Sequence, residues 1–498
     1  MSTRKIFVMA VTCLILSGIY VLRTVYNRTQ GQRTTENMTR LISSNSGLTI
    51  YPAPSDEDLS KDYRLEVNGK AVDIYLAQIA AIENRPPWTL DPKDVGGPYS
   101  FSYFDFSGSV TIKVSALNTS FDQVVIRPLS AGIKPVIEGN TLTFNIHRPC
   151  KLSIEPNGRR EPLLIFANPL EIDPPKIDDP DVIYYGPGIH KPEKIILKTG
   201  QTLYIAGGAV VKSGVAVSGK NIKIKGRGIL CGNDWEWKKG PGNMIGIRDA
   251  ENVSIEGIIL RGSWSWTIPM YNSKGVNITN VKMVCSKNPN DDGINPCNSQ
   301  DVYIGDCFIR TDDDCIAMKG ITLGSANDNV ENIVVENCIL WSDRARVFLL
   351  GHESRAPYMR HITLSDLEII HFNMSPFLFE PGEEMSIENV RVENVRLYAD
   401  YPKQNGERTF EWIRLKPTVN QYMKRQVPGR MRNLYFKNLA LTGEAREGWY
   451  YIWITGADEA HQVTDVTLEN ITWFGERLDE NSLQVKIGDF TNGVKFRR

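Results

Sequence analysis

A short unit recurs nine times between residues 221 and 468, and it limits the possible folds more than any other feature of this sequence. Each unit has an Asn- or Asp-like residue, then an apolar residue, then alternating polar and apolar positions that lead to a second Asn or Gly. The units begin at Asn221, Asn252, Gly275, Asp301, Asn332, His361, Asn389, Asn433 and Asp465. Their spacing is mostly in the twenties to low thirties, with no helical pattern between them. Such spacing is typical of a right-handed parallel β-helix.

The residue types of the unit have a physical reason in such a solenoid. Side chains of successive coils stack at about 4.8 Å and form aliphatic and polar ladders. Asn tolerates the left-handed conformation that a coil corner needs, which explains why it recurs. The long interval from Val390 to Leu434 predicts inserted loops that wall a cleft. A leucine-rich repeat is the main competing solenoid, but its Leu-x-x-Leu-x-Leu pattern is absent.

The region before the repeats has a different pattern. Short alternating runs separated by Gly, Pro and Asn predict an antiparallel β-sandwich, with a Pro-rich linker at residues 172–180. The expected strands are residues 63–67, 109–115, 124–128 and 141–146. The chain is therefore predicted to be all-β, with a leader and polar spacer at 1–46, the sandwich at 47–180 and the β-helix at 181–498.

The first residues predict export. Arg4 and Lys5 precede an apolar run over residues 6–22, the order found in a signal peptide or signal anchor. A secreted, periplasmic or cell-surface location is expected, and an uncleaved N-terminal membrane anchor is an alternative to cleavage. The 57 basic and 58 acidic residues balance to a net charge of −1, which gives no electrostatic reason to expect nucleic-acid binding. The sequence predicts no particular oligomeric state.

The cysteines favour buried thiols over disulfides or a metal site. Beyond the leader their number is odd, and no Cys-x-x-Cys pair supports a zinc site. Several recur at about one repeat length, as expected for thiols inside a solenoid. The seven are Cys150, Cys231, Cys285, Cys297, Cys307, Cys315 and Cys338.

Two acidic clusters follow one another at about one coil length. They read NDDGIN at residues 290–295 and TDDDCIA at residues 311–317. On a solenoid, Asp292 and the pair Asp313 and Asp314 would then lie on one face, one coil above the other. Like charges that close raise the pKa of at least one carboxyl, as a general acid requires, while the others stay ionised as base. This set suits hydrolysis of a glycosidic bond, although one such cluster alone would fit an ordinary turn or a Ca²⁺ site.

On these motifs the chain resembles the polygalacturonase-like β-helix enzymes, family 28 of the glycoside hydrolases. Residues 290–295 are similar to the family's Asn-Thr-Asp-Gly-x-Asp motif, with Asp291 in the Thr position, and residues 313–317 match Asp-Asp-Cys-Ile-Ala. The resemblance implies inverting hydrolysis with Asp313 as general acid, while Asp292 and Asp314 hold and deprotonate the attacking water. The two-domain layout also resembles the family 49 dextranases, which act on neutral α-glucan.

The sequence departs from the family 28 pattern where the sugar would be recognised. The next coil has Asp343-Arg344-Ala345-Arg346-Val347 in place of the family's Gly-His-Gly, and an Arg-x-Lys pair occurs further along than expected. Galacturonate and a neutral sugar therefore both stay open. The candidate substrate-binding residues are Asn290, Trp266, Arg344, Arg346, His352, Glu380, Arg414 and Lys416. Further aromatic candidates for stacking on sugar rings are Tyr271, Trp341 and Trp412.

Three functions remain at this stage. The first is an exported glycoside hydrolase acting on a poly- or oligosaccharide without metal or other cofactor. The second is a polysaccharide lyase, in which acids hold Ca²⁺ and an Arg or Lys abstracts a proton next to a uronate carboxylate. The third is a non-catalytic carbohydrate-binding adhesin, which the mutually repelling acids disfavour.

Overall fold

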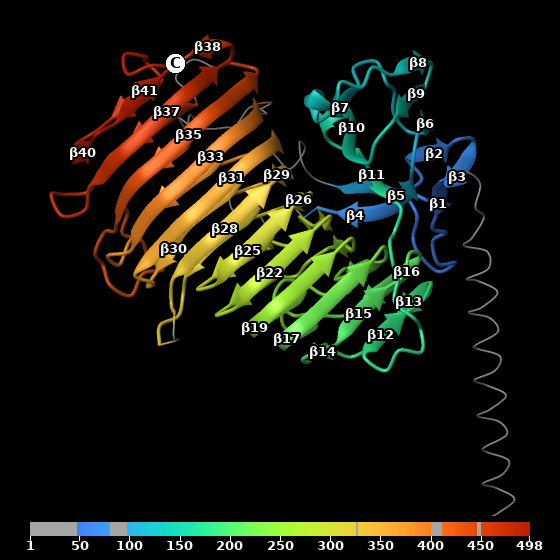
Figure 1. Cartoon of the computed structure of the whole chain (residues 1–498). Helices are drawn as coiled ribbons and strands as arrows, with labels where there is room; N and C mark the ends of the chain where they lie inside the picture. The colour runs from blue at the N-terminus through green and yellow to red at the C-terminus, as the bar shows by residue number, and fades with distance from the viewer. Residues whose placement is uncertain (1–46, 80–96, 325–326, 400–410, 446–449) are drawn as a thin grey trace, which may run out of the picture.

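The computed structural model describes residues 47–79, 97–324, 327–399, 411–445 and 450–498, so the predicted leader lies outside the described part. Two all-β units are present (Figure 1), which confirms the predicted fold class. Apart from one 3₁₀ turn, η2 (Leu129–Ala131), the regular elements of these residues are strands. In this part of the chain no helix has the length and apolar character needed to cross a membrane.

The N-terminal unit is a sandwich of two sheets, ordered β1-β5-β11-β10-β7 with β4 beside β5, and β3-β2-β6-β9-β8. Its pairs are antiparallel as predicted except β5 with β11, which run parallel. Alternating side chains of both sheets form its core. The strands are β1 (Leu48–Ile50), β2 (Tyr63–Val67), β3 (Lys70–Val72), β4 (Tyr75–Gln78), β5 (Pro98–Phe106), β6 (Val110–Ala116), β7 (Val125–Arg127), β8 (Val136–Glu138), β9 (Thr141–Ile146), β10 (Cys150–Arg159) and β11 (Leu163–Pro169).

From β12 onward the chain coils into a parallel β-helix with three sheets, here called the repeat, sandwich-facing and cleft sheets. Six long strands bend through a corner and belong to two sheets each: β17 (Val215–Gly226), β19 (Ile245–Glu256), β31 (Tyr358–His371), β33 (Ser386–Ala399), β35 (Arg430–Gly443) and β37 (Val463–Trp473). The repeat sheet contains all six together with β12 (Val182–Tyr185), β15 (Thr202–Ile205), β22 (Lys274–Thr279), β25 (Gln300–Gly305), β28 (Val330–Glu336) and β41 (Lys495–Arg497).

The other two sheets are built from shorter strands. The sandwich-facing sheet has β13 (Gly188–His190), β16 (Ala209–Lys212), β18 (Ile229–Cys231), β20 (Ile259–Arg261), β23 (Lys282–Val284), β26 (Phe308–Thr311) and β29 (Ile339–Ser342), then the ends of β31, β33, β35 and β37. The cleft sheet has β14 (Ile195–Leu197), the starts of β17 and β19, then β21 (Ile268–Tyr271), β24 (Ile294–Cys297), β27 (Ile316–Gly320), β30 (Phe348–Ser354), β32 (Phe377–Glu380), β34 (Glu411–Leu415), β36 (Tyr451–Ile454) and β39 (Val485–Ile487). Two-residue strands β38 (Glu476–Arg477) and β40 (Thr491–Asn492) pair with β37.

The recurring unit of the sequence forms a corner in nine of the twelve strands of the repeat sheet. All nine first residues are left-handed, with φ between 54° and 66°. They also form a ladder, in which Asn252 donates to Asn221 at 2.6 Å and Asn332 donates to Asp301 at 2.8 Å. The predicted left-handed corners and polar ladder are therefore confirmed.

Inside the coils, apolar side chains and thiols stack in register. The apolar second residues of successive units pair directly, as Val302 does with Ile333. Rings stack in the same way, with Phe348 and Phe377 centred 5.5 Å apart and nearly parallel. The seven cysteines are free and all except Cys150, which is half-buried, are buried, as predicted.

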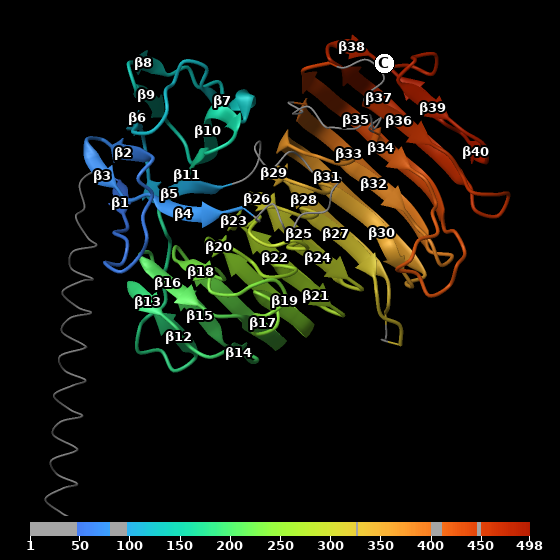
Figure 2. The same ribbon diagram turned by 180° about the vertical axis from the view of Figure 1, so that it is seen from behind.

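The sandwich lies beside the sandwich-facing sheet (Figures 1 and 2). Apolar and charged side chains make the contacts between them. Arg227 pairs with Asp105 at 2.8 Å and Arg261 with Glu57 at 2.7 Å, with all four side chains buried. Buried ion pairs need matched partners to offset their desolvation, so these pairs define how the two units dock.

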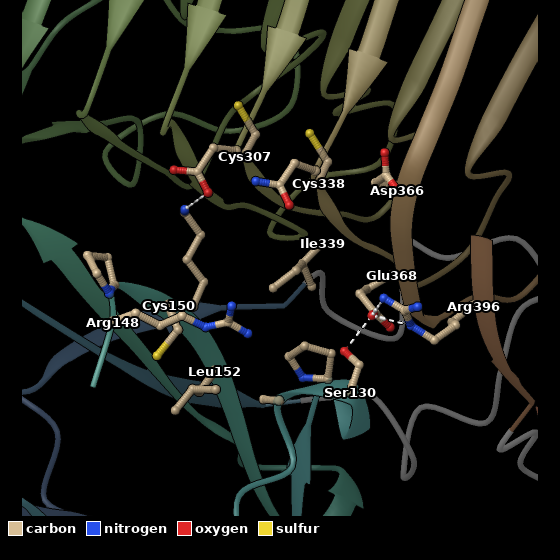
Figure 3. A pocket seen from close by; sticks show the side chains of 16 residues that line it. Ser130, Arg148, Cys150, Leu152, Cys307, Cys338, Ile339, Asp366, Glu368 and Arg396 are labelled. Atoms are coloured by element: carbon tan, nitrogen blue, oxygen red, sulfur yellow. Dashed lines mark hydrogen bonds and ion pairs between the residues drawn. The ribbon is translucent and has the colours of Figure 1, made fainter. Parts of the chain in front are cut away.

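A pocket of about 640 Å³ lies between the two units (Figure 3). Lys151 of β10 crosses it to Asp306 at 2.6 Å, and Ser130 of the sandwich donates to Glu368 of β31 at 2.5 Å. Arg396 pairs with the same Glu368. The charges of Lys151, Glu368 and Arg396 are thus matched within the molecule, and two of these contacts tie the sandwich to the β-helix.

The left-handed corner at Asn332 makes a stability prediction. Asn332→Val should lower the free energy of unfolding by about 1–2 kcal/mol, because a β-branched residue resists positive φ. Asn332→Gly, which adopts this conformation freely, should cost less. Urea denaturation of both variants is the measurement, and equal losses would contradict a conformational role for this corner.

Candidate active site

Three consecutive turns between the sandwich-facing and cleft sheets bring the predicted acids together. They are residues 285–293, 312–315 and 343–347, which connect β23 to β24, β26 to β27 and β29 to β30. The amide of Gly293 donates to the carbonyl of Asp314 at 2.9 Å, so the first two turns are adjacent coils. The one-coil offset therefore places Asp292 beside the Asp313 and Asp314 pair.

Asp292 is buried, and polar side chains surround its carboxylate. Asn295 donates to it at 2.8 Å and Asn290 at 3.4 Å, while Lys319 Nζ lies 3.6 Å away. Burial raises the pKa of Asp292, the ammonium of Lys319 opposes this, and the nearby Asp313 adds to it.

Asp313 has the most exposed carboxyl of the three, with 14% of its side chain accessible, and it lines a cleft. Arg344 donates to it at 2.8 Å and also to Asp312 at 2.6 Å. Burial favours the neutral form, but the charges of Arg344, Arg346 and Lys319 outweigh it and hold the pKa of Asp313 below its usual value. Without a ligand, Asp313 is therefore an ionised carboxylate.

Of the three carboxyls, Asp314 is the one whose pKa is shifted close to neutral pH. Burial raises the pKa of Asp314 to about 7; Arg346 opposes the shift, and Asp313 and Asp292 reinforce it. Arg346 binds the same carboxylate through its side chain at 2.8 Å and through its backbone amide at 3.0 Å. Arg344, Arg346 and Lys319 thus offset the charge of the crowded acids.

Lys319 belongs to this group, although the sequence analysis did not single it out. Its ammonium lies between Asp292 and Glu353, at 3.6 and 3.5 Å, and 4.1 Å from the ring centre of Trp266. The predicted sugar-stacking residue Trp266 is therefore in contact with a protein cation on one ring face. The sequence signal that could have identified Lys319 is strand alternation. Lys319 is two residues after Ala317, so both side chains lie on the outward face of β27.

The predicted residues His352, Glu380, Arg414 and Lys416 lie on later coils. His352 pairs with Glu380 and stacks on Tyr422, with ring centres 5.5 Å apart. Burial opposes ionisation of Glu380, yet the bond and charge of His352 hold its pKa below the usual value. Arg414 lies on the third coil after that of Asp313, about 14 Å along the solenoid at the usual strand spacing.

Arg414 and Lys416 share one aromatic neighbour. Arg414 lies 5.5 Å and Lys416 4.5 Å from the ring centre of Trp453. Both residues are thus separated by three coils from the acids, whereas Arg344 and Arg346 contact them directly. Two other aromatic predictions are wrong: Trp341 and Trp412 are fully buried and unavailable to a sugar.

The cleft that Asp313 and Arg344 line has a volume of about 690 Å³, within the usual range of ligand sites. Trp237 and Tyr422 also line it and are 45% and 50% exposed. Lys238 lies 4.4 Å from the ring centre of Trp237 and has no ion-pair partner among the described residues. Trp237, Lys238 and Tyr422 have no periodic signal in the sequence, because they lie in irregular loops.

The carboxylates of this site are paired with protein cations. Arg344, Arg346 and Lys319 already occupy positions beside the carboxylates, where a cation would need free oxygens. In the described ranges, no group of three or more His, Cys, Asp or Glu side chains is placed to hold a metal ion.

Residues 198–340 match the family model of the glycosyl hydrolases family 28. The resemblance is thereby confirmed for the segment that carries Asp292, Asp313 and Asp314, while Arg344 and every later candidate lie beyond it. A probable polygalacturonase of Vitis vinifera is 28% identical over 154 residues, which are 28% of this chain and 30% of the relative. A probable exopolygalacturonase B of Neosartorya fischeri is 26% identical over 241 residues, 44% of this chain and 43% of the relative.

This chain thus spans less than half the length of these curated relatives. Among solved structures, Dex49A from Penicillium minioluteum is similar with a TM-score of 0.66 and 15% identity. The similarity covers 91% of this chain and 99% of that chain, so the whole two-unit fold is shared.

The position of Lys319 makes a second prediction. Lys319→Met should lower the free energy of unfolding by about 3–5 kcal/mol, because it leaves the buried Asp292 and the half-buried Glu353 without their cation. Lys319→Arg keeps the charge and is the matched control. The measurement is urea denaturation followed by tryptophan fluorescence, and a Met variant as stable as the wild type would contradict the inferred charge balance.

Proposed function

We propose that this protein is a glycoside hydrolase that cleaves a polygalacturonate-type polysaccharide by inverting acid/base hydrolysis. The observation that carries the proposal is the packing of Asp292, Asp313 and Asp314 on adjacent coils beside an open cleft. Two carboxyl groups of unlike protonation are what hydrolysis of a glycosidic bond requires. The relatives named as polygalacturonases support the choice of reaction.

Asp313 is assigned as the proton donor because its carboxyl lines the cleft where the leaving oxygen would lie. In the ligand-free site Arg344 keeps Asp313 ionised, and the proton rests on Asp314. A uronate carboxylate in the cleft would compete for the guanidinium of Arg344, since such groups pair in a bidentate manner. Loss of that countercharge raises the pKa of Asp313, so the proton passes to it from Asp314.

Transfer of that proton prepares both halves of the reaction. Asp313 then protonates the leaving glycosidic oxygen as its bond to the anomeric carbon breaks. Asp314 and Asp292, now both ionised, hold a water and take one of its protons as the oxygen attacks the opposite face. The site ends with one proton, as it began, and the net change is addition of water across the bond.

The cations of the cleft favour an acidic sugar over a neutral one. Arg344 and Lys238 face the same space as Asp313, and Trp237 and Tyr422 present aromatic surface to sugar rings. A dextranase-like action on neutral α-glucan is the second candidate, and the two-unit fold shared with Dex49A motivates it. That action gives no role to the charge of Lys238, which has no ion-pair partner in the part of the chain that the structure describes.

A lyase mechanism fits this site less well. Burial disfavours the charge of Arg344, but Asp313 and Asp312 more than restore it and hold its pKa above the usual value, so it is a poor proton acceptor. The acids that would hold Ca²⁺ are already paired with arginines. The proposed hydrolysis is therefore independent of metal. The leader-like first residues extend the proposal to an exported enzyme, with a membrane anchor as the alternative.

A reducing-end assay tests the function. Wild-type protein should release reducing ends from polygalacturonate with or without chelator, and Asp313→Asn should lower kcat at least about 100-fold without changing the thermal unfolding temperature. Asp301→Asn is the control, because Asp301 lies in the chain between the two acid clusters but outside the site. Asn at this position keeps the left-handed corner and still accepts the hydrogen bond from Asn332. Activity on dextran alone supports the second candidate. Formation of unsaturated products that stops when chelator is added would show a metal-dependent lyase and would contradict the proposed hydrolysis.

The raised pKa of Asp314 predicts the pH dependence. The proton that drives the reaction is lost above about pH 7, so kcat/KM should fall about tenfold per pH unit beyond that point. Arg346→Gln removes a positive charge that lowers this pKa, so the alkaline limb should move to higher pH. Initial rates between pH 4 and 9 are the measurement, and a limb that Arg346→Gln leaves in place would exclude Asp314 as the titrating group.

A further inference from the structure

We propose that the N-terminal sandwich positions the catalytic turn, and that Tyr99 transmits this effect through a buried chain of contacts to the backbone of Asp312 and Asp313. Tyr99 is a positioning residue in this proposal, and it lies outside residues 198–340, which match the family model. The inference rests on the proposed function for its kinetic readout, but the chain of contacts itself can be tested without substrate.

The chain begins where β5 of the sandwich meets the sandwich-facing sheet. Tyr99 is fully buried there, and its hydroxyl donates to the carbonyl of Cys285 at 2.9 Å. The guanidinium of Arg310 is held between two rings, 4.1 Å from the centre of Tyr99 and 3.7 Å from that of Trp341. Desolvated cation–π contacts of this kind are strong enough to hold a side chain in place.

Asp343 is the next residue in the chain of contacts, and it is bound to Arg310. The two form an ion pair at 3.0 Å in which neither side chain is exposed. Asp343 also accepts from Trp341 Nε1 at 2.7 Å and from Ser286 Oγ at 2.6 Å. A buried carboxylate with this many donors has little freedom to move, because any lost bond is not replaced by water.

Ser286 and Asp291 complete the connection to the catalytic turn. The Ser286 amide donates to Asp291 Oδ2 at 2.6 Å. The other oxygen of Asp291 accepts the amides of Asp312 at 2.7 Å and Asp313 at 3.2 Å. Since Cys285 precedes Ser286, the hydroxyl of Tyr99 acts on this same segment by a second route. The sandwich is therefore connected to the backbone that aims Asp313 into the cleft.

This arrangement also explains Asp291, the departure from the family motif. Burial and the charge of Asp312 raise the pKa of Asp291, while three amides favour its ionised form. Its carboxylate is turned inward to the backbone and not toward the cleft. Asp291 thus fixes the turn of residues 312–315 on the neighbouring coil. This role needs two acceptor oxygens, one for the Ser286 amide and one for the amides of Asp312 and Asp313.

The rest of the interface allows Tyr99 to be changed without releasing the sandwich. The pairs Arg227 with Asp105 and Lys151 with Asp306 do not involve it. Tyr103, on the same strand, supplies a matched control: it is equally buried and accepts the amide of Gly208 in the β-helix at 3.0 Å. Tyr99→Leu and Tyr103→Leu thus remove similar volumes from one interface, but only the first touches the chain of contacts.

The first test is hydrogen–deuterium exchange of the full chain without substrate. Tyr99→Leu should speed exchange in peptides that contain residues 285–291 and 312–314, and Tyr103→Leu should leave both unchanged relative to wild type. Tyr99→Phe, which keeps the ring but not the hydroxyl, should have an intermediate effect. Equal exchange of these peptides in the two Leu variants would overturn the proposal whatever the enzyme acts on.

The second test is kinetic and uses polygalacturonate below both variants' unfolding temperatures. Tyr99→Leu should lower kcat about 10- to 100-fold with little change in KM, because a small misplacement of a reacting group has effects of this size. Tyr103→Leu should retain the wild-type kcat. Equal kcat in the two variants would overturn the positioning role, whereas a wild type without activity on polygalacturonate, together with the expected exchange pattern, would overturn only the substrate assignment.

Discussion

The backbone hydrogen bonds between successive coils are the constraint on which this site depends. They hold neighbouring turns about 4.8 Å apart, so side chains at equivalent positions of successive coils lie in direct contact. In the corners this spacing makes an asparagine ladder, and in the core it makes stacked aliphatic side chains. At the turns of residues 285–293 and 312–315, the same spacing brings carboxylates close together in spite of their mutual repulsion.

That crowding is tolerated because the following coils supply matched charge. Arg344 and Arg346 contact the acids from the turn after Asp313 and Asp314, and Lys319 contacts Asp292 from the strand β27. The result is a set of carboxyls with unequal pKa, raised to about 7 for Asp314 and held below the usual value for Asp313. Arg344 also lines the cleft. In the proposed mechanism, this one guanidinium therefore couples binding of a uronate carboxylate to the protonation of Asp313.

The parts that the sequence could predict are those that depend on local repetition. The left-handed corners from Asn221 to Asp465, the buried thiols and the strands at Tyr63–Val67 and Thr141–Ile146 all follow from short-range patterns. The adjacency of Asp292 and Asp313 follows from one coil length. Irregular loops have no such period, which is why the sequence does not single out Trp237, Lys238 and Tyr422. Trp341 lies instead in strand β29, where it packs against side chains of the sandwich, and no local pattern indicates that cover.

By itself, the sequence determined an all-β chain, its two units and the place where acids accumulate, because periodic spacing translates directly into stacking. Only the tertiary structure decided the charge state of each acid, since desolvation and countercharges depend on groups distant along the chain. It also decided that Tyr99, more than 180 residues before Cys285, contacts the segment behind the catalytic turn. Such contacts arise from the docking of two separately folded surfaces, and no local pattern in either surface encodes their pairing.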